Sequence, residues 1–250
     1  LGLPSLRARI AQHYQETYGV HVPMERVAVT TGSSGGFILA FLSLFDAGAR
    51  VAVAAPGYPA YRNILEAIDV EVVTLETMAR DRHAVTAAMI EAAHAQRPLD
   101  GVLLMSPANP TGTMMSDETL AEISATCQRL GIAFVSDEIY HGLTYERPAQ
   151  TALAFGDQAI IVNSFSKYYC MTGWRIGRAA VAEFCDFAAD LESDRRGESL
   201  RCDRRSRNRQ GRLCSQSCLA DPGIAAHRPG RFSPRRRCFL SLLQRQPLHQ

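Results

Sequence analysis

Three consecutive segments decide the fold: Gly-Val-Leu-Leu-Met-Ser (101–106), the helical stretch 117–130, and Ile-Ala-Phe-Val-Ser-Asp-Glu-Ile-Tyr (132–140). The two apolar runs are short and continuous, which is typical of strands that are buried on both faces. The stretch between them has the length and polar–apolar mixture of a surface helix. A strand, a helix and a second strand in this order predict a parallel sheet covered by helices.

The same alternation extends outward from this unit over residues 25 to about 180. Further strands are expected at 27–31, 50–54, 71–75, 159–163 and 175–181, and further helices at 36–45, 58–67 and 84–96. Residues 1–20 also predict a helix, because Leu6, Ile10 and Tyr14 recur at intervals of four after Pro4. The expected architecture is therefore an α/β sheet, mostly parallel, in which ligands bind outside the carboxyl ends of the strands.

Composition sets broad limits on the class of protein. The 250 residues fit one large domain, and a hydrophobic content of 46% supports a sizeable core. No apolar run is long enough to span a bilayer, so no membrane partner is expected. The seven cysteines form no Cys-x-x-Cys pair, and the histidines show no metal-ligand spacing. We expect a cytoplasmic protein without a metal, whose true start is missing because the chain begins with Leu1.

Charge divides the chain into two parts. Residues 1–194 contain 13 basic and 22 acidic residues, whereas residues 195–250 contain 14 arginines and only three acidic residues. A basic tail of this kind is open to three interpretations: a nucleic-acid-binding arm, a disordered tail, or translation of a GC-rich gene in the wrong frame. The mixture of Arg, Cys, Ser, Pro, Gln and His without lysine favours the frame error, so no nucleic-acid partner is expected.

Lys167 is the only lysine among 27 basic residues. Its amine can form a Schiff base with an aldehyde, which a permanently protonated arginine cannot do. A GC-rich coding sequence that prefers arginine codons explains a lone lysine equally well. The residues at the other strand ends decide between these two interpretations.

The segments after the first two strands suggest a phosphate site and a flat ligand. Gly32, Ser33 and Ser34 precede an apolar helix, whose amino end can bind an anion through backbone N–H groups, although a tight strand–helix turn explains them as well. Tyr58 follows the second strand, and its ring either stacks on a flat ligand or packs in the core.

The segments after the fourth and fifth strands add hydrogen-bonding groups. Asn109 lies in a firm turn, Ser-Pro-Ala-Asn-Pro-Thr-Gly, and its amide both donates and accepts. Asp137 directly follows a buried run and therefore needs a cationic or donor partner. Strand alternation directs the side chain of Glu138 away from that of Asp137.

Ser164, Lys167 and Arg175 complete the set, and arginine is suited to bidentate phosphate contact. Together these groups match the needs of pyridoxal 5′-phosphate. Lys167 is expected to form the Schiff base, and Asp137 to keep the pyridine nitrogen protonated. Asn109 and Tyr140 are expected to bind the ring oxygen, Tyr58 to stack on the ring, and the phosphate to be held by Gly32, Ser33, Ser34, Ser164 and Arg175.

The motifs Ser-x-Asn-Pro-Thr-Gly, Asp-Glu-Ile-Tyr and Ser-Phe-Ser-Lys…Gly-Trp-Arg-Ile-Gly resemble those of the class I/II aminotransferases, which are fold-type I enzymes, over residues 1 to about 177. The resemblance implies a three-layer sandwich around a mostly parallel seven-stranded sheet, the large domain of these enzymes. It also implies a homodimer and the transfer of an amino group between an amino acid and a 2-oxo acid. Lys167, Asp137 and Tyr140 are the catalytic residues that it implies, with Lys167 as proton carrier.

The chain departs from the family at both ends. We expect an N-terminal helical segment at 1–24 with its arm truncated, a cofactor-binding large domain at 25–182, and a tail at 183–250 in place of the small domain. The arginine that binds the substrate carboxylate cannot be assigned, so this chain is expected to be a fragment with impaired activity. A β-lyase on the same scaffold, a non-catalytic cofactor-binding regulatory domain and the product of a disrupted gene remain as alternatives.

Overall fold

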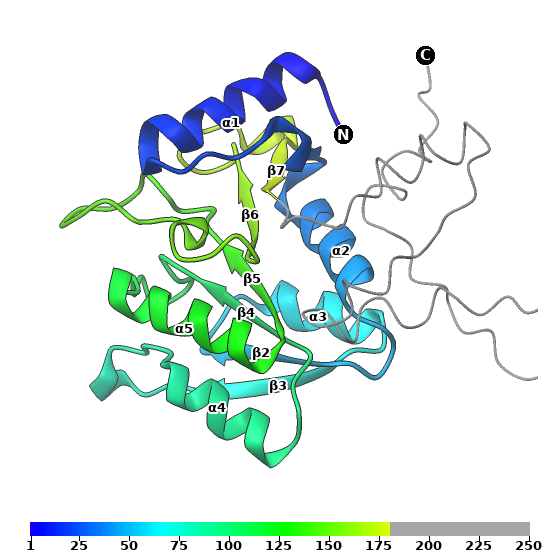
Figure 1. Ribbon diagram of the computed structural model, residues 1–250, viewed down its shortest axis with the longest axis vertical. Coiled ribbons are helices and arrows are strands. Elements are labelled where there is room, and N and C mark those ends of the chain that lie inside the picture. Colours follow the sequence, from blue (N-terminus) through cyan, green and yellow to red (C-terminus); the bar gives the residue numbers. More distant parts are fainter. Residues whose placement is uncertain (181–250) are drawn as a thin grey trace, which may run out of the picture. The chain divides into compact units, whose positions relative to one another are not determined.

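The computed structural model describes residues 1–180, and the tail expected at 183–250 lies outside the described residues. The described part contains seven strands in one sheet, in the order β1-β7-β6-β5-β4-β2-β3 (Figure 1). The strands are β1 (Val27–Thr30), β2 (Arg50–Ala55), β3 (Glu71–Glu76), β4 (Gly101–Met105), β5 (Ala133–Asp137), β6 (Ile160–Ser164) and β7 (Gly177–Ala180).

Every pairing in the sheet is parallel except the two that β7 makes, with β1 and with β6. The helices are α1 (Pro4–Tyr18), α2 (Gly32–Leu44), α3 (Pro59–Ala67), α4 (Ala87–Gln96) and α5 (Asp117–Leu130). No helix among residues 1–180 combines the length and the apolar character needed to cross a bilayer.

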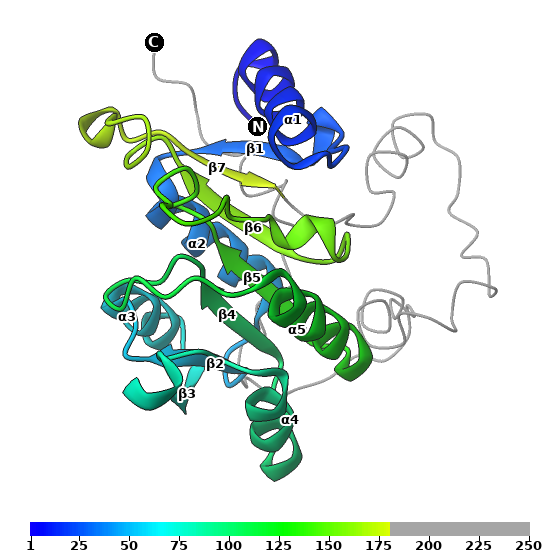
Figure 2. The same cartoon turned by 90° about the vertical axis from the view of Figure 1, so that its left-hand side faces the viewer.

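Helices lie on both faces of the sheet (Figures 1 and 2), and an apolar cluster packs on each face. One cluster joins α1, α4 and α5 to the sheet through Ile10, Ile90 and Ile123. The other joins α2 and α3 to the opposite face through Phe41 and Leu65. The expected three-layer α/β sandwich with a mostly parallel seven-stranded sheet is therefore confirmed.

Local boundaries differ from the expectations by a few residues, and two differences have clear causes. The helix expected at 84–96 begins at Ala87, because the Thr86 side chain accepts a hydrogen bond from Met89 N and caps that helix. The last expected strand does not include Arg175, which has a positive φ of 51° after a short 3-10 helix at Thr172–Trp174. Strand β7 begins only at Gly177.

The start of β7 packs directly on the start of α2. A Cβ atom at Gly177 would meet the carbonyl carbon of Gly32 and would lie 2.7 Å from Ser33 N. Real Cβ atoms do not approach backbone this closely, so a side chain at position 177 would push the two elements apart. Gly177 thus fixes how near the antiparallel strand comes to the amino end of α2.

We predict that Gly177→Ala destabilises the chain by about 1–3 kcal/mol, the usual cost of overpacking. Gly173→Ala is the matched control, because no atom lies within 4 Å of a Cβ built there. Urea denaturation of both variants measures the difference. Equal stability of the two variants would contradict the close packing of β7 on α2.

Candidate functional site

The predicted site residues meet at the carboxyl end of the sheet. The parallel strands β1, β2, β4, β5 and β6 all end there, and each is followed by one of the segments singled out in the sequence. Because β7 runs in the opposite direction, its beginning lies at this same end, close to Arg175. The topology therefore gathers residues that are up to 143 positions apart, from Gly32 to Arg175.

Arg175 lies against the amino end of α2. Its Nη2 atom would be 2.5 Å from a Cβ at Gly32, where φ is +75°. Ser33 and Ser34 follow in the first turn of α2, whose free N–H groups and dipole favour an anion. The Arg175 guanidinium donates to Thr172 O at 3.2 Å and is exposed. This arrangement provides a cationic, donor-rich cradle suited to a phosphate.

Ser164 is the last residue of β6 and is buried beside this cradle. Its hydroxyl lies 2.7 Å from Ser166 Oγ and 3.1 Å from Ile176 O. Those contacts fix the loop between β6 and Arg175. Ser164 therefore shapes the wall of the phosphate cradle in this structure.

Asp137 is the last residue of β5, the central strand, and its exposed fraction is only 2%. The Tyr61 hydroxyl donates to its Oδ2 atom, and Ile139 N donates to its Oδ1 atom at 3.0 Å. Burial raises the pKa of this carboxyl to about 7, although both hydrogen bonds oppose the shift. A buried carboxyl with two donors can bind a protonated ring nitrogen.

Tyr61 is the residue that sequence reasoning missed. It lies on α3, three positions after Tyr58, which precedes the helix with an extended backbone. Their rings are nearly perpendicular, with centroids 5.4 Å apart. Tyr58 is 41% exposed, and Tyr61 is buried against Phe37 of α2. The i, i+3 spacing of the two tyrosines was the available signal, and the structure assigns the contact with Asp137 to the second of them.

Lys167 follows β6 in an exposed loop, and its Nζ atom lies 5.8 Å from the centroid of the Tyr140 ring. The next residue, Tyr168, packs on Gly142, where a Cβ atom would meet the Tyr168 ring at 2.5 Å. The loop that carries the amine therefore lies against the turn that carries Tyr140. Asn109 occupies the loop after β4, where its backbone N–H contacts Met105 Sδ at 3.3 Å.

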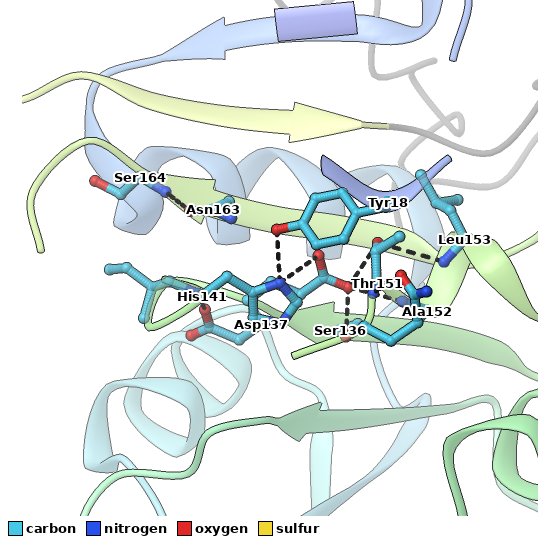
Figure 3. A network of polar contacts seen from close by, with 12 residues as sticks. Tyr18, Ser136, Asp137, His141, Thr151, Ala152, Leu153, Asn163 and Ser164 are labelled. Carbon is cyan, nitrogen blue, oxygen red and sulfur yellow. Dashed lines mark hydrogen bonds and ion pairs between the residues drawn. The ribbon is translucent and has the colours of Figure 1, made fainter. Parts of the chain in front are cut away.

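Glu138 points away from Asp137, as strand alternation predicted. Its side chain joins a separate polar network on the other face of the sheet, with Ser136, Thr151, Ala152 and His141 (Figure 3). Two neighbouring buried carboxyls thus have different surroundings. No group of three His, Cys, Asp or Glu side chains suited to a metal occurs among residues 1–180.

We predict that the contribution of the Asp137 carboxyl to the free energy of unfolding of the cofactor-free chain falls as the pH rises from about 4 to about 7. The folded pKa of Asp137 is raised above its unfolded value, so stability is full below the unfolded pKa and is lost as the pH rises through the folded one. At roughly 1.4 kcal/mol per pKa unit, the loss is on the order of 4 kcal/mol.

Asp137→Asn should remove this part of the pH dependence, whereas Asp69→Asn, at an exposed site, should leave it unchanged. Urea denaturation at a series of pH values measures the slope. The same slope in the wild type and in Asp137→Asn over this range would contradict the raised pKa.

Comparison with known proteins shows which family the chain belongs to. Residues 1–231 match the family "Aminotransferase class I and II". A valine–pyruvate aminotransferase of Mycobacterium tuberculosis is 52% identical over 179 residues, which cover 71% of this chain and 46% of that protein. The chain spans about half the length of the curated relatives it matches.

Solved structures agree with this match. A crystal structure of an aminotransferase from Mycobacterium tuberculosis has a TM-score of 0.71 and 49% identity, covering 78% of this chain and 50% of that one. A relative from Silicibacter pomeroyi has a TM-score of 0.70 and 45% identity, with 78% and 52% covered. Enzymes of this family depend on pyridoxal 5′-phosphate, and the resemblance noted in the sequence is confirmed: the chain belongs to the class I and II aminotransferases.

Proposed function

We propose that this chain is the cofactor-binding part of an aminotransferase that moves an amino group between an amino acid and a 2-oxo acid. One observation carries the proposal: a buried carboxyl, Asp137, and the only lysine, Lys167, lie at the same end of the sheet as the anion cradle of α2 and Arg175. Pyridoxal 5′-phosphate needs these groups at its ring nitrogen, aldehyde and phosphate.

The residues of this chain would hold the cofactor at three points. Ser33, Ser34 and Arg175 bind the phosphate, with Gly32 leaving room for the guanidinium. Lys167 would hold the aldehyde end through its amine Nζ. Asp137 faces the ring nitrogen, held in orientation by the Tyr61 hydroxyl. These residues fit the group, because the buried carboxyl of Asp137 and the exposed guanidinium of Arg175 match the opposite ends of the molecule.

The remaining side chains would orient the ring and move protons. Asn109 and Tyr140 donate to the ring oxygen, and Tyr58, which is partly exposed, covers one ring face. When bound, the cofactor supplies an electron sink for the bond that breaks at the substrate α-carbon. Lys167 would carry the proton from that carbon, and the Tyr140 ring lies near the amine, with its centroid 5.8 Å from Nζ. Lys167, Asp137 and Tyr140 are therefore the proposed catalytic residues.

The wider organisation is also a proposal. We infer a division into a helical segment at 1–24 and a cofactor-binding domain at 25–182, and a homodimer in the cytoplasm as the working form. The relative from Mycobacterium tuberculosis is named for valine and pyruvate, so these are the first substrates to test. Because the arginine for the substrate carboxylate is unassigned, we infer impaired turnover by the 250-residue chain.

Covalent attachment tests the role of Lys167. Reduction with borohydride in the presence of pyridoxal 5′-phosphate should fix one cofactor per chain at Lys167, because the N-terminal amine is the only other primary amine in the sequence. Lys167→Ala should abolish that label, and Arg175→Lys should weaken binding but keep the label at position 167. Peptide mass spectrometry locates it, and a label that persists in Lys167→Ala at the N-terminus would contradict the assignment.

Transfer of ¹⁵N from valine to pyruvate tests the reaction itself. The 250-residue chain should yield labelled alanine slowly, well below the full-length relative, and Lys167→Ala should yield none. Product analysis also separates the alternatives, since a β-lyase gives pyruvate and a thiol from a cysteine conjugate and a regulatory domain gives no product. Turnover equal to that of the full-length enzyme would contradict the inferred impairment.

A further inference from the structure

A row of buried polar side chains crosses three strands on the face covered by α1 and α5. Asn163 of β6 is paired in register with Arg178 of β7. On the other side of β6, Glu138 N donates to Val162 O at 2.9 Å, which continues the pairing of β5 beyond its last residue. Glu138, Asn163 and Arg178 therefore stand side by side on one face, and their exposed fractions are 1%, 4% and 4%.

Glu138 anchors the turn at residues 137–142. Its Oε1 atom accepts from Ala152 N at 2.9 Å, Thr151 Oγ1 at 3.0 Å and Ser136 Oγ at 3.4 Å. Its Oε2 atom lies 3.6 Å from His141 Nδ1, which the Tyr18 hydroxyl of α1 contacts at 2.9 Å (Figure 3).

His141 does not neutralise this carboxyl. Burial lowers the pKa of His141 to about 4, so the ring is neutral at pH 7. Burial also raises the pKa of Glu138 to about 7; the hydrogen bonds from Ala152 N and Thr151 Oγ1 oppose that rise most, and the charge of Arg178 opposes it as well. Arg178 is thus the cation that favours the ionised carboxylate.

Arg178 reaches the loop that carries Lys167. Its guanidinium carbon lies 5.5 Å from the centroid of the Tyr14 ring and 5.7 Å from that of Phe165. Phe165 is two residues before Lys167, and its backbone N–H donates to Ile176 O at 3.1 Å. A cation buried between two rings holds both of them in place.

Three buried side-chain atoms among residues 1–180 make no hydrogen bond: Tyr14 Oη, Glu138 Oε2 and Arg178 Nε. All three belong to this row and to the helix above it. They are a hydroxyl, an acceptor and a donor, which are the kinds of group that internal water binds. Uncompensated buried charge is costly, so a link between the carboxylate and the guanidinium is strongly favoured.

We propose that Glu138 and Arg178 are positioning residues whose opposite charges, linked across Asn163 by internal water, hold the 137–142 turn and the 165–170 loop at a fixed separation. The turn carries Asp137 and Tyr140, and the loop carries Lys167. The consequence for cofactor binding rests on the proposed function, whereas the link itself is a property of the cofactor-free chain.

Amide hydrogen exchange of the full 250-residue chain without cofactor tests the link. Glu138→Gln should speed exchange by about tenfold or more in the loop it does not touch, at Cys170 N and Met171 N, and Arg178→Gln should do the same in the turn, at His141 N and Leu143 N. The double variant should recover part of each loss, because it leaves no unpaired charge. Ile123→Ala, a core variant on the same face, should loosen neither segment selectively.

If Glu138→Gln fails to fold, Thr151→Val replaces it, because Thr151→Val removes one donor to Glu138 and keeps the charge of that carboxylate. Thr151→Val should speed exchange at Cys170 N and Met171 N to a smaller degree. Unchanged exchange in the loop, or single-variant losses that simply add in the double variant, would overturn the proposal.

Titration with pyridoxal 5′-phosphate tests the proposed function separately from the proposed link between Glu138 and Arg178. If the wild type binds, Glu138→Gln should raise the Kd by about 10- to 100-fold, the effect of misplacing reacting groups, while Ile123→Ala should not. A wild type that binds no cofactor but shows coupled exchange would overturn the proposed function and leave the link intact. Binding by the wild type with independent exchange in the two segments would overturn the link alone.

Discussion

The burial of the Asp137 carboxyl at the end of β5 is the constraint on which the rest of the site depends. Strand β5 is the middle strand of seven, so its end is enclosed by α2 and α3 on one face. Removing a carboxyl from water is costly unless donors replace the solvent. Tyr61 and Ile139 supply two hydrogen bonds. The pKa nevertheless stays raised, which leaves the carboxyl in need of a further, positively charged partner.

The two acidic residues at the end of β5 point to opposite faces of the sheet and have different partners there. Asp137 belongs to the face of α2 and α3, where the anion cradle lies. Glu138 belongs to the face of α1, where it contacts Thr151 and His141 and stands in the same row as Arg178 of β7. The period of two along a strand is sufficient to separate a ligand-facing carboxyl from a structural one. The same local pattern therefore serves both the chemistry and the framework that supports it.

Much of the fold followed from the sequence, because most strands are short apolar runs and β1, β2, β3 and β4 are each followed by a helix. The position of Asp137 at a strand end was predictable for the same reason. Its partner Tyr61 was not, since nothing local distinguishes it from Tyr58; only the packing of α3 shows which tyrosine points inward. The position of Arg178 was also not predictable, because a lone arginine in a short strand gives no sign that it is buried between two rings.

The most direct test of the account is a crystal structure of the 250-residue chain with pyridoxal 5′-phosphate. The proposed cofactor site predicts a phosphate at the amino end of α2, within hydrogen-bond distance of Ser33 and Arg175. It also predicts the ring nitrogen beside Asp137 and electron density continuous with Lys167 Nζ. A cofactor bound elsewhere, or a ring whose nitrogen is turned away from Asp137, would contradict the central claim that these strand ends form one cofactor site.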